Sequence, residues 1–145
     1  MAIIIQPLIM SDWPWCKDMA MEEANQFDYL RADEDKMKVL FTDGVSSARS
    51  FAVKAVSDSK PVGMMVALSA PNLWAGKQCS NVLIWVSRLA PAGALLIREY
   101  KKWLEGRPAI RVSGFTPCID LPEQTNRLME HFGFAQTSGC FLSVK

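Results

Sequence analysis

The chain has 145 residues, half of them hydrophobic, and its 16 basic and 15 acidic residues leave a formal net charge of +1. A chain of this length can bury a core of its own, so we expect one domain over residues 1–145. The sequence contains no basic stripe typical of nucleic-acid binding and no apolar stretch long enough to cross a membrane.

The cysteine and histidine content narrows the chemistry further. The four cysteines lie far apart with no CxxC pair, which argues against a zinc ribbon and against a disulfide framework. A single histidine, His131, excludes a multi-histidine metal site. We therefore expect a cytoplasmic protein with reduced thiols and no metal.

A strand and two helices are predicted at the start of the chain. The strand covers residues 2–10, and the helix after it ends near Asn25, with Ser11 or Asp12 as its N-terminal cap. Within the charged segment 26–50, apolar residues indicate a second, short helix: Met37, Leu40 and Phe41.

The clearest hairpin comes next. Period-two alternation of apolar side chains over residues 51–56 is typical of a half-buried strand, and residues 62–68 are its predicted returning partner. The segment 57–61, Ser-Asp-Ser-Lys-Pro, supplies the turn. A loop is predicted over residues 71–77.

A strand that leads directly into a helix organises the second half of the chain. The apolar run 82–86 predicts a buried strand, and apolar residues at helical spacing predict a helix over residues 95–105. Pro91 suits the first turn of this helix, and Gly106 suits the position after its end.

The junction between this strand and helix is a candidate anion site. The first backbone N–H groups of a helix are unpaired and lie at the positive end of its dipole. Small side chains would let a diphosphate approach them, although tight strand–helix packing would explain the same residues. These small residues are Ala90, Ala92, Gly93 and Ala94.

Two strands and a helix complete the predicted fold. A strand is expected over residues 109–114, a helix over 121–131 capped by Asp120, and a last strand over 140–144. The order of elements predicts an α+β fold with a mixed sheet and helices on both faces. The strands 82–86 and 109–114 should be parallel neighbours that diverge at their C-terminal ends.

The element order and three motifs resemble the GNAT superfamily, the GCN5-related N-acetyltransferases. Residues 53–68 look like the second and third strands of that family. Arg88-x-x-Pro91-x-Gly93 looks like its acyl-CoA pyrophosphate loop, usually written R/Q-x-x-G-x-G/A. Residues 130–134, Glu-His-Phe-Gly-Phe, look like the end of its last helix. The resemblance implies a splayed sheet of about six to seven strands flanked by about four helices.

The resemblance also implies acetyl-CoA as the co-substrate and an amine as the acceptor. It assigns the thioester carbonyl to the backbone of Val86. It assigns the pyrophosphate to Arg88 and to the small residues at the helix start, Ala90, Ala92, Gly93 and Ala94.

The catalytic residues of the family are poorly matched. The first glycine of the pyrophosphate loop is Pro91 here, which has no N–H to offer a phosphate. The tyrosine that often protonates the leaving thiolate would fall at Met129. Cys118 is the candidate substitute, although a thiol has an ordinary pKa of about 8.5.

Two functions follow from the resemblance. The first is an acyl-CoA-dependent N-acetyltransferase that transfers acetyl directly to an amine, with acceptor specificity in residues 26–50 and 69–80. The alternative is a catalytically inactive GNAT-fold binding or assembly protein, for example a virion component of a bacterial virus. Five tryptophans and eight methionines would suit burial against protein partners or against a second copy. No nucleic-acid or membrane partner is expected.

Overall fold

The computed structural model describes residues 2–26, 32–72, 77–115 and 122–135. Within these residues one mixed sheet has the strand order β1-β2-β3-β4-β5. The strands are β1 (Ile3–Pro7), β2 (Ser50–Ser57), β3 (Lys60–Asn72), β4 (Lys77–Ser87) and β5 (Ile110–Phe115). The helices are a 3-10 turn (Met10–Asp12), α1 (Trp13–Ala24), α2 (Glu34–Ser46), α3 (Ala90–Glu105) and α4 (Glu123–His131).

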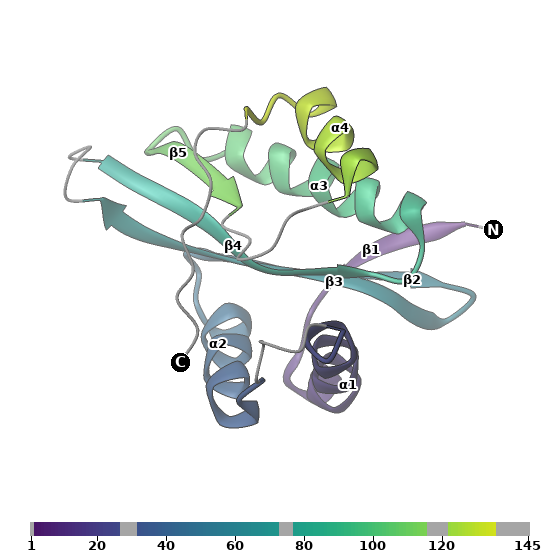
Figure 1. The fold of residues 1–145 in the computed structure, drawn as a ribbon. Helices are drawn as coiled ribbons and strands as arrows, with labels where there is room; N and C mark the ends of the chain where they lie inside the picture. Colours follow the sequence, from purple (N-terminus) through teal and green to yellow (C-terminus); the bar gives the residue numbers. More distant parts are fainter. Residues whose placement is uncertain (1, 27–31, 73–76, 116–121, 136–145) are drawn as a thin grey trace, which may run out of the picture.

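The predicted α+β class, with four helices around a mixed sheet, is confirmed. Helices α3 and α4 cover one face of the sheet, and α1 and α2 cover the other (Figure 1). The described residues form five strands rather than the six to seven expected. The predicted strand 140–144 lies outside the described residues. The last helix was expected to start at residue 121 with Asp120 as its cap, but α4 begins at Glu123 with Pro122 as its N-cap.

The predicted hairpin forms β2 and β3. Ser57 pairs with Lys60, so the loop consists of Asp58 and Ser59 alone. Both residues have positive φ, 49° and 64°, as a type I′ turn requires. The twist of this turn matches the right-handed twist of the two strands that it joins.

Helix α3 begins earlier than the sequence predicts, at Ala90 rather than at residue 95. Pro91 lies in its first turn, where a fixed φ suits a helix and a missing N–H costs no intrahelical bond. The small residues that follow are therefore helical, and Ala92 is fully buried against the sheet. Alanine has the highest intrinsic helix propensity, which favours this early start.

Two apolar cores lie on the two faces of the sheet. The core under α3 contains an aromatic group in which Tyr100 packs against Phe51, Trp103 and Phe115, with ring centroids 5.4 to 6.1 Å apart. The Tyr100 hydroxyl donates a hydrogen bond of 2.8 Å to the buried Ser80 Oγ, which joins α3 to β4. Burial raises the pKa of Tyr100, and the bond to Ser80 only partly offsets this.

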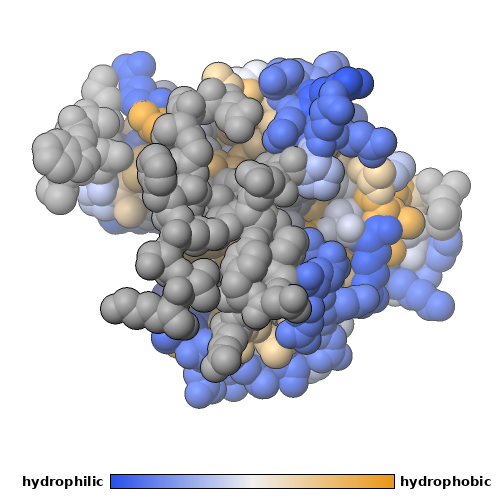
Figure 2. Space-filling view, viewed as in Figure 1, coloured by the Kyte–Doolittle hydropathy of each residue, from blue (hydrophilic) through white to orange (hydrophobic). Residues whose placement is uncertain are grey.

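The second core lies under α1 and α2 and includes Cys16, Met19, Phe41, Met64 and Val66. Burial, together with the nearby Asp12 carboxylate, raises the pKa of the Cys16 thiol to about 12. This cysteine is therefore an uncharged part of the core. Figure 2 shows hydrophilic residues over the outer surfaces of the helices, with apolar residues visible between them at the level of the sheet.

A buried carboxylate ties the start of α1 to the sheet. Asp12 precedes α1, but its side chain makes no capping bond to α1. It accepts hydrogen bonds from the Ile9 amide at 2.9 Å and from the Trp15 indole at 3.1 Å. Lys54 Nζ of β2 lies 2.7 and 2.8 Å from its two oxygens.

Candidate functional site

Strand β4 runs on past its last described pair with β5. Parallel pairing runs from Gln78–Ile110 to Val82–Phe115, where the described part of β5 ends, and β4 continues to Ser87. Leu83 is an extra residue in β4, between the pairs Ala67–Val82 and Val66–Ile84. Such a bulge bends its strand and increases the twist. The predicted parallel pairing of these strands is confirmed, and its last described pair lies next to this bulge.

The β3–β4 ladder shows which backbone groups at the end of β4 face away from β3. The Arg88 amide donates to the Val62 carbonyl at 2.8 Å, and Met64 pairs with Val86 two residues further along the ladder. Hydrogen-bonded pairs alternate in an antiparallel ladder, so the Val86 amide belongs to β3. The amides of Trp85 and Ser87 then point away from β3, on the side of the strand that faces β5.

The N-cap of α3 uses several of the donors that a phosphate would need. The amides of Ala92 and Gly93 both donate to the carbonyl of Leu89, the N-cap residue, at 3.0 and 3.1 Å. The Leu89 amide donates to Ser87 Oγ at 3.3 Å, and the Ser87 hydroxyl donates back to the Leu89 carbonyl. The backbone groups of this turn are therefore already hydrogen-bonded to one another and to Ser87.

The backbone N–H group of Ala90 is the donor that remains available in this turn. It is exposed at the first position of α3, where the helix supplies no acceptor for its N–H group. Pro91 has no N–H, and the amide of Ala94 lies in the part of the helix where the regular ladder supplies a carbonyl. The predicted set of backbone donors is therefore brought together, but most of its members are already bonded.

Arg88 is held by an acidic side chain of α1. Its guanidinium lies 2.7 Å from Glu22 Oε2, and both side chains are more than half exposed, at 54% and 64%. A pair this exposed contributes about 0–1 kcal/mol, so an anion can replace Glu22 at little cost. The pair directs the Arg88 guanidinium toward α1, so a phosphate at the start of α3 would have to draw it away from Glu22.

Gly93 lies against β4 rather than in solvent. A Cβ at this position would lie 3.5 Å from Ser87 Cβ and 3.7 Å from the Trp85 ring, which is ordinary contact. Trp85 itself packs edge-on against Phe115, with ring centroids 5.4 Å apart. The contacts of Gly93 therefore support close strand–helix packing, one of the two explanations that its small size left open.

The candidate general acids differ in their placement. Cys118 lies outside the described residues. His131 is exposed in the last turn of α4, with its ring beside that of Phe132. Met129, which stands at the tyrosine position of the family motif, is 8% exposed and belongs to the core under α3.

Replacing Met129 by tyrosine is expected to destabilise the fold by about 1–3 kcal/mol, because the ring exceeds the space in a filled core. Urea unfolding measures this loss, and Met129→Leu, which nearly conserves volume, should cost less than about 1.5 kcal/mol. A Met129→Tyr protein with unchanged stability and faster consumption of acetyl-CoA would contradict this expectation.

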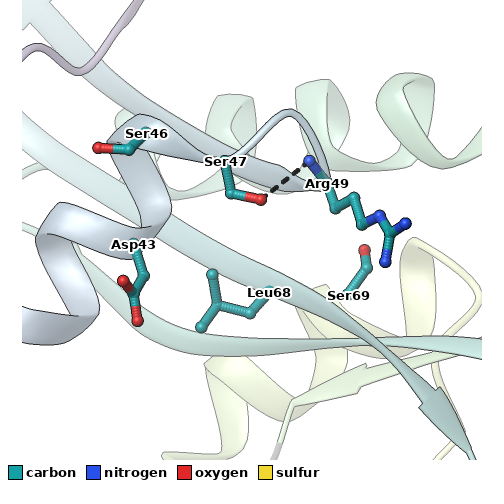
Figure 3. Close-up of a pocket in the computed structure, with 6 residues that line it drawn as sticks. All are labelled: Asp43, Ser46, Ser47, Arg49, Leu68 and Ser69. Atoms are coloured by element: carbon teal, nitrogen blue, oxygen red, sulfur yellow. Dashed lines mark hydrogen bonds between the residues drawn. The ribbon is translucent and has the colours of Figure 1, made fainter.

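A surface depression of about 400 Å³ lies where α2 meets the first residues of β2 (Figure 3). Asp43 of α2 and Arg49 lie on opposite sides of it, and Leu68 of β3 lies between them. Ser47 Oγ accepts a hydrogen bond from the Arg49 amide, which holds this turn. Leu68 pairs with Asn81 of β4, so the depression lies close to the bulge at residue 83.

The described residues include no group of three or more His, Cys, Asp or Glu side chains that could hold a metal ion. No helix in the described ranges is both long and apolar enough to cross a membrane.

Comparison with known proteins rests on structure alone, because no family model and no curated protein matches the sequence. The ribosomal-protein-alanine N-acetyltransferase of Brucella melitensis biovar Abortus 2308 superposes with a TM-score of 0.72 at 18% identity, over 99% of both chains. A putative acetyl transferase of Pyrococcus furiosus gives 0.74 at 12% identity, over 98% of this chain and 99% of the other. A GNAT family acetyltransferase of Staphylococcus aureus subsp. aureus USA300_TCH1516 gives 0.65 at 12% identity, over 99% and 98%. The chain therefore has the fold of the GNAT acetyltransferases.

Proposed function

We propose that β4 and β5 diverge beyond the pair Val82–Phe115, and that this protein binds acetyl-CoA in the opening between them and transfers its acetyl group to an amine. The observation that carries the proposal is that β4 continues past its last described pair with β5, bulges at Leu83 and ends beside the start of α3. A slender ligand arm can enter such an opening and bond to strand amides that lack a partner strand. The structural neighbours named as acetyltransferases support this reaction class.

The pyrophosphate of the ligand fits the start of α3 only in part. The Ala90 amide and the Arg88 guanidinium are suitable partners for a phosphate oxygen, and the helix dipole favours the negative charge. The amides of Ala92 and Gly93 already donate to the Leu89 carbonyl. We therefore expect binding that is weaker than a full glycine-rich turn would give.

The chain's own contribution to the reaction is positioning. Acetyl-CoA supplies the activated acetyl group, and the amide of Trp85 or Ser87 would donate a hydrogen bond to its carbonyl oxygen. One such donor is typically worth about 10²–10³-fold in rate. A missing general acid costs about 10²–10⁴-fold. We infer slow transfer that rises with pH as the acceptor amine loses its proton.

The acceptor amine is proposed to reach the opening from the side of α2. The depression between Asp43 and Arg49 is formed by the two chain segments to which we assign acceptor specificity. Its carboxylate offers a partner for a cationic amine, and its guanidinium offers a partner for an acidic group on the same acceptor.

Replacing Ala90 by proline tests the phosphate contact. Proline is well tolerated at the first helical position, so the change removes the available N–H group without breaking α3. A hydrogen bond to a charged group is worth about 1.5–3 kcal/mol, so affinity for acetyl-CoA should fall about tenfold or more by calorimetry. Ala90→Ser, which keeps the amide, is the matched control.

The reciprocal change, Pro91→Ala, restores an amide to the turn and should tighten binding. An affinity that is the same in Ala90→Pro, Pro91→Ala and the native protein would refute the assignment of the pyrophosphate to this turn. If acetyl-CoA does not bind the native protein at all, the acetyltransferase proposal fails and a non-catalytic binding role is left.

A further inference from the structure

We propose that the protein self-associates through the free edge of β1, which would pair antiparallel with β1 of a second copy. In the described part of the chain, β1 is an edge strand that pairs only with β2 (Figure 1). Edge strands present unpaired N–H and C=O groups, and soluble proteins usually protect them with charged residues. The sequence of β1 is Ile-Ile-Ile-Gln-Pro, with no charge.

The ladder with β2 identifies which groups of β1 are free. The Leu8 amide donates to the Ala52 carbonyl at 3.1 Å, and Ile4 pairs with Val56 in the same register. Because bonded pairs alternate, the N–H and C=O groups of Ile3 and Ile5 point away from β2. Pro7 also faces the free edge, where its missing N–H leaves no donor unpaired.

This edge is complementary to a second copy of itself in one register. If Ile3 of one copy lies opposite Ile5 of the other, each free N–H meets a C=O and four hydrogen bonds form around a two-fold axis. Ile4 then lies directly opposite Ile4 of the partner subunit. Centring the pair on Ile5 instead would place Ile3 opposite a proline that cannot donate.

The side chain on this axis is apolar and accessible. Ile4 is 51% exposed, although isoleucine is among the residues most often buried. Ile9 and Met10, which are 52% and 48% exposed, follow β1 and lie beyond the residues that pair in this register. No formal charge on β1 would oppose a second copy.

The dimer should be weak and dependent on concentration. Stable interfaces bury about 1,200–2,000 Å², and a pair of five-residue strands with a few flanking side chains lies at the low end of that scale. Self-association is independent of acetyl-CoA binding, because β1 and the opening beside β5 lie at opposite edges of the sheet.

A charge swap at Ile4 tests the register. In sedimentation velocity, the native protein should show a monomer–dimer equilibrium, and Ile4→Lys and Ile4→Glu should each weaken it about tenfold or more, because like charges would lie opposite each other. Mixing the two variants should restore the dimer, since the charges are then opposite in sign. Val39→Lys, at a residue of α2 that is 59% exposed, is the control and should leave the equilibrium unchanged.

The proposal is overturned by a native protein that stays monomeric up to about 1 mM. It is also overturned if the dimer is insensitive to Ile4→Lys, or if the mixture fails to restore it. Circular dichroism of both variants should show the native fold, because the substituted position is exposed.

Discussion

Replacing Asp12 by alanine is expected to lower the free energy of unfolding by about 3–5 kcal/mol. The side chains of Lys54 and Asp12 are only 15% and 11% exposed, so the change leaves a largely buried ammonium group without its counter-charge. It also removes the acceptor of the Ile9 amide and the Trp15 indole. Urea unfolding of the two proteins measures the difference.

The double variant Asp12→Asn with Lys54→Met provides the control. Removing both charges avoids the unpaired ammonium group, so the double variant should be more stable than Asp12→Ala. If it is no more stable than Asp12→Ala, the unpaired ammonium group of Lys54 is not the source of the loss.

The same site has a defined pH dependence. Burial alone would raise the pKa of Asp12, but hydrogen bonds from Lys54, Ile9 and Trp15 and the charge of Lys54 outweigh it, so the pKa lies below its ordinary value. The stability that it contributes is therefore present above about pH 4 and is lost as the pH falls through the lowered pKa. The free energy of unfolding of Asp12→Asn should therefore fall less than that of the native protein when the pH is lowered through this range.

Replacing Tyr100 by alanine is expected to cost about 3–5 kcal/mol, because it empties the centre of the core under α3. Tyr100 is fully buried and contacts three aromatic rings. Tyr100→Phe keeps the ring but removes the donor to the buried Ser80 hydroxyl, so about 1–3 kcal/mol should be lost.

The two substitutions at Tyr100 separate packing from hydrogen bonding. If Tyr100→Phe costs as much as Tyr100→Ala, the bond to Ser80 dominates and the packing argument is wrong. This bond joins α3 to β4 next to the proposed acetyl-CoA site. We therefore also expect Tyr100→Phe to weaken acetyl-CoA binding while its circular dichroism spectrum stays that of the native fold.

Much of the fold could be predicted because its patterns are local. The hairpin follows from period-two alternation, and Pro91 and Gly106 mark the two ends of α3 closely. The apolar periodicity places the start of α3 too late, because Ala90, Ala92 and Gly93 carry no large apolar side chain that would show helical spacing. Their helical state depends on packing against β4, which is a tertiary effect.

The candidate site was harder to predict for the same reason. The pair between Arg88 and Glu22 joins residues far apart in the sequence, and no local pattern indicates it. The orientation of the amides of Trp85 and Ser87 depends on the register of β3 and β4, and the bulge changes that register. The ion pair of Asp12 and Lys54 joins two separate elements, and residue type alone suggested only a helix cap for Asp12.

The extra residue in β4 also changes which core the even-numbered residues of this strand face. Before Leu83, the even-numbered Ser80 and Val82 face α3, whereas after it Ile84 and Val86 face α1 and α2. One strand thus supplies both cores with the same parity of residue number, which explains why its central segment is apolar without a break. Deleting Leu83 would make Val82 and Ile84 consecutive, opposite Ala67 and Val66, which are consecutive in β3, so both segments would keep the cores that they face and only the bulge would be lost. A one-residue deletion well away from the bulge would instead turn the residues on one side of it toward the wrong core.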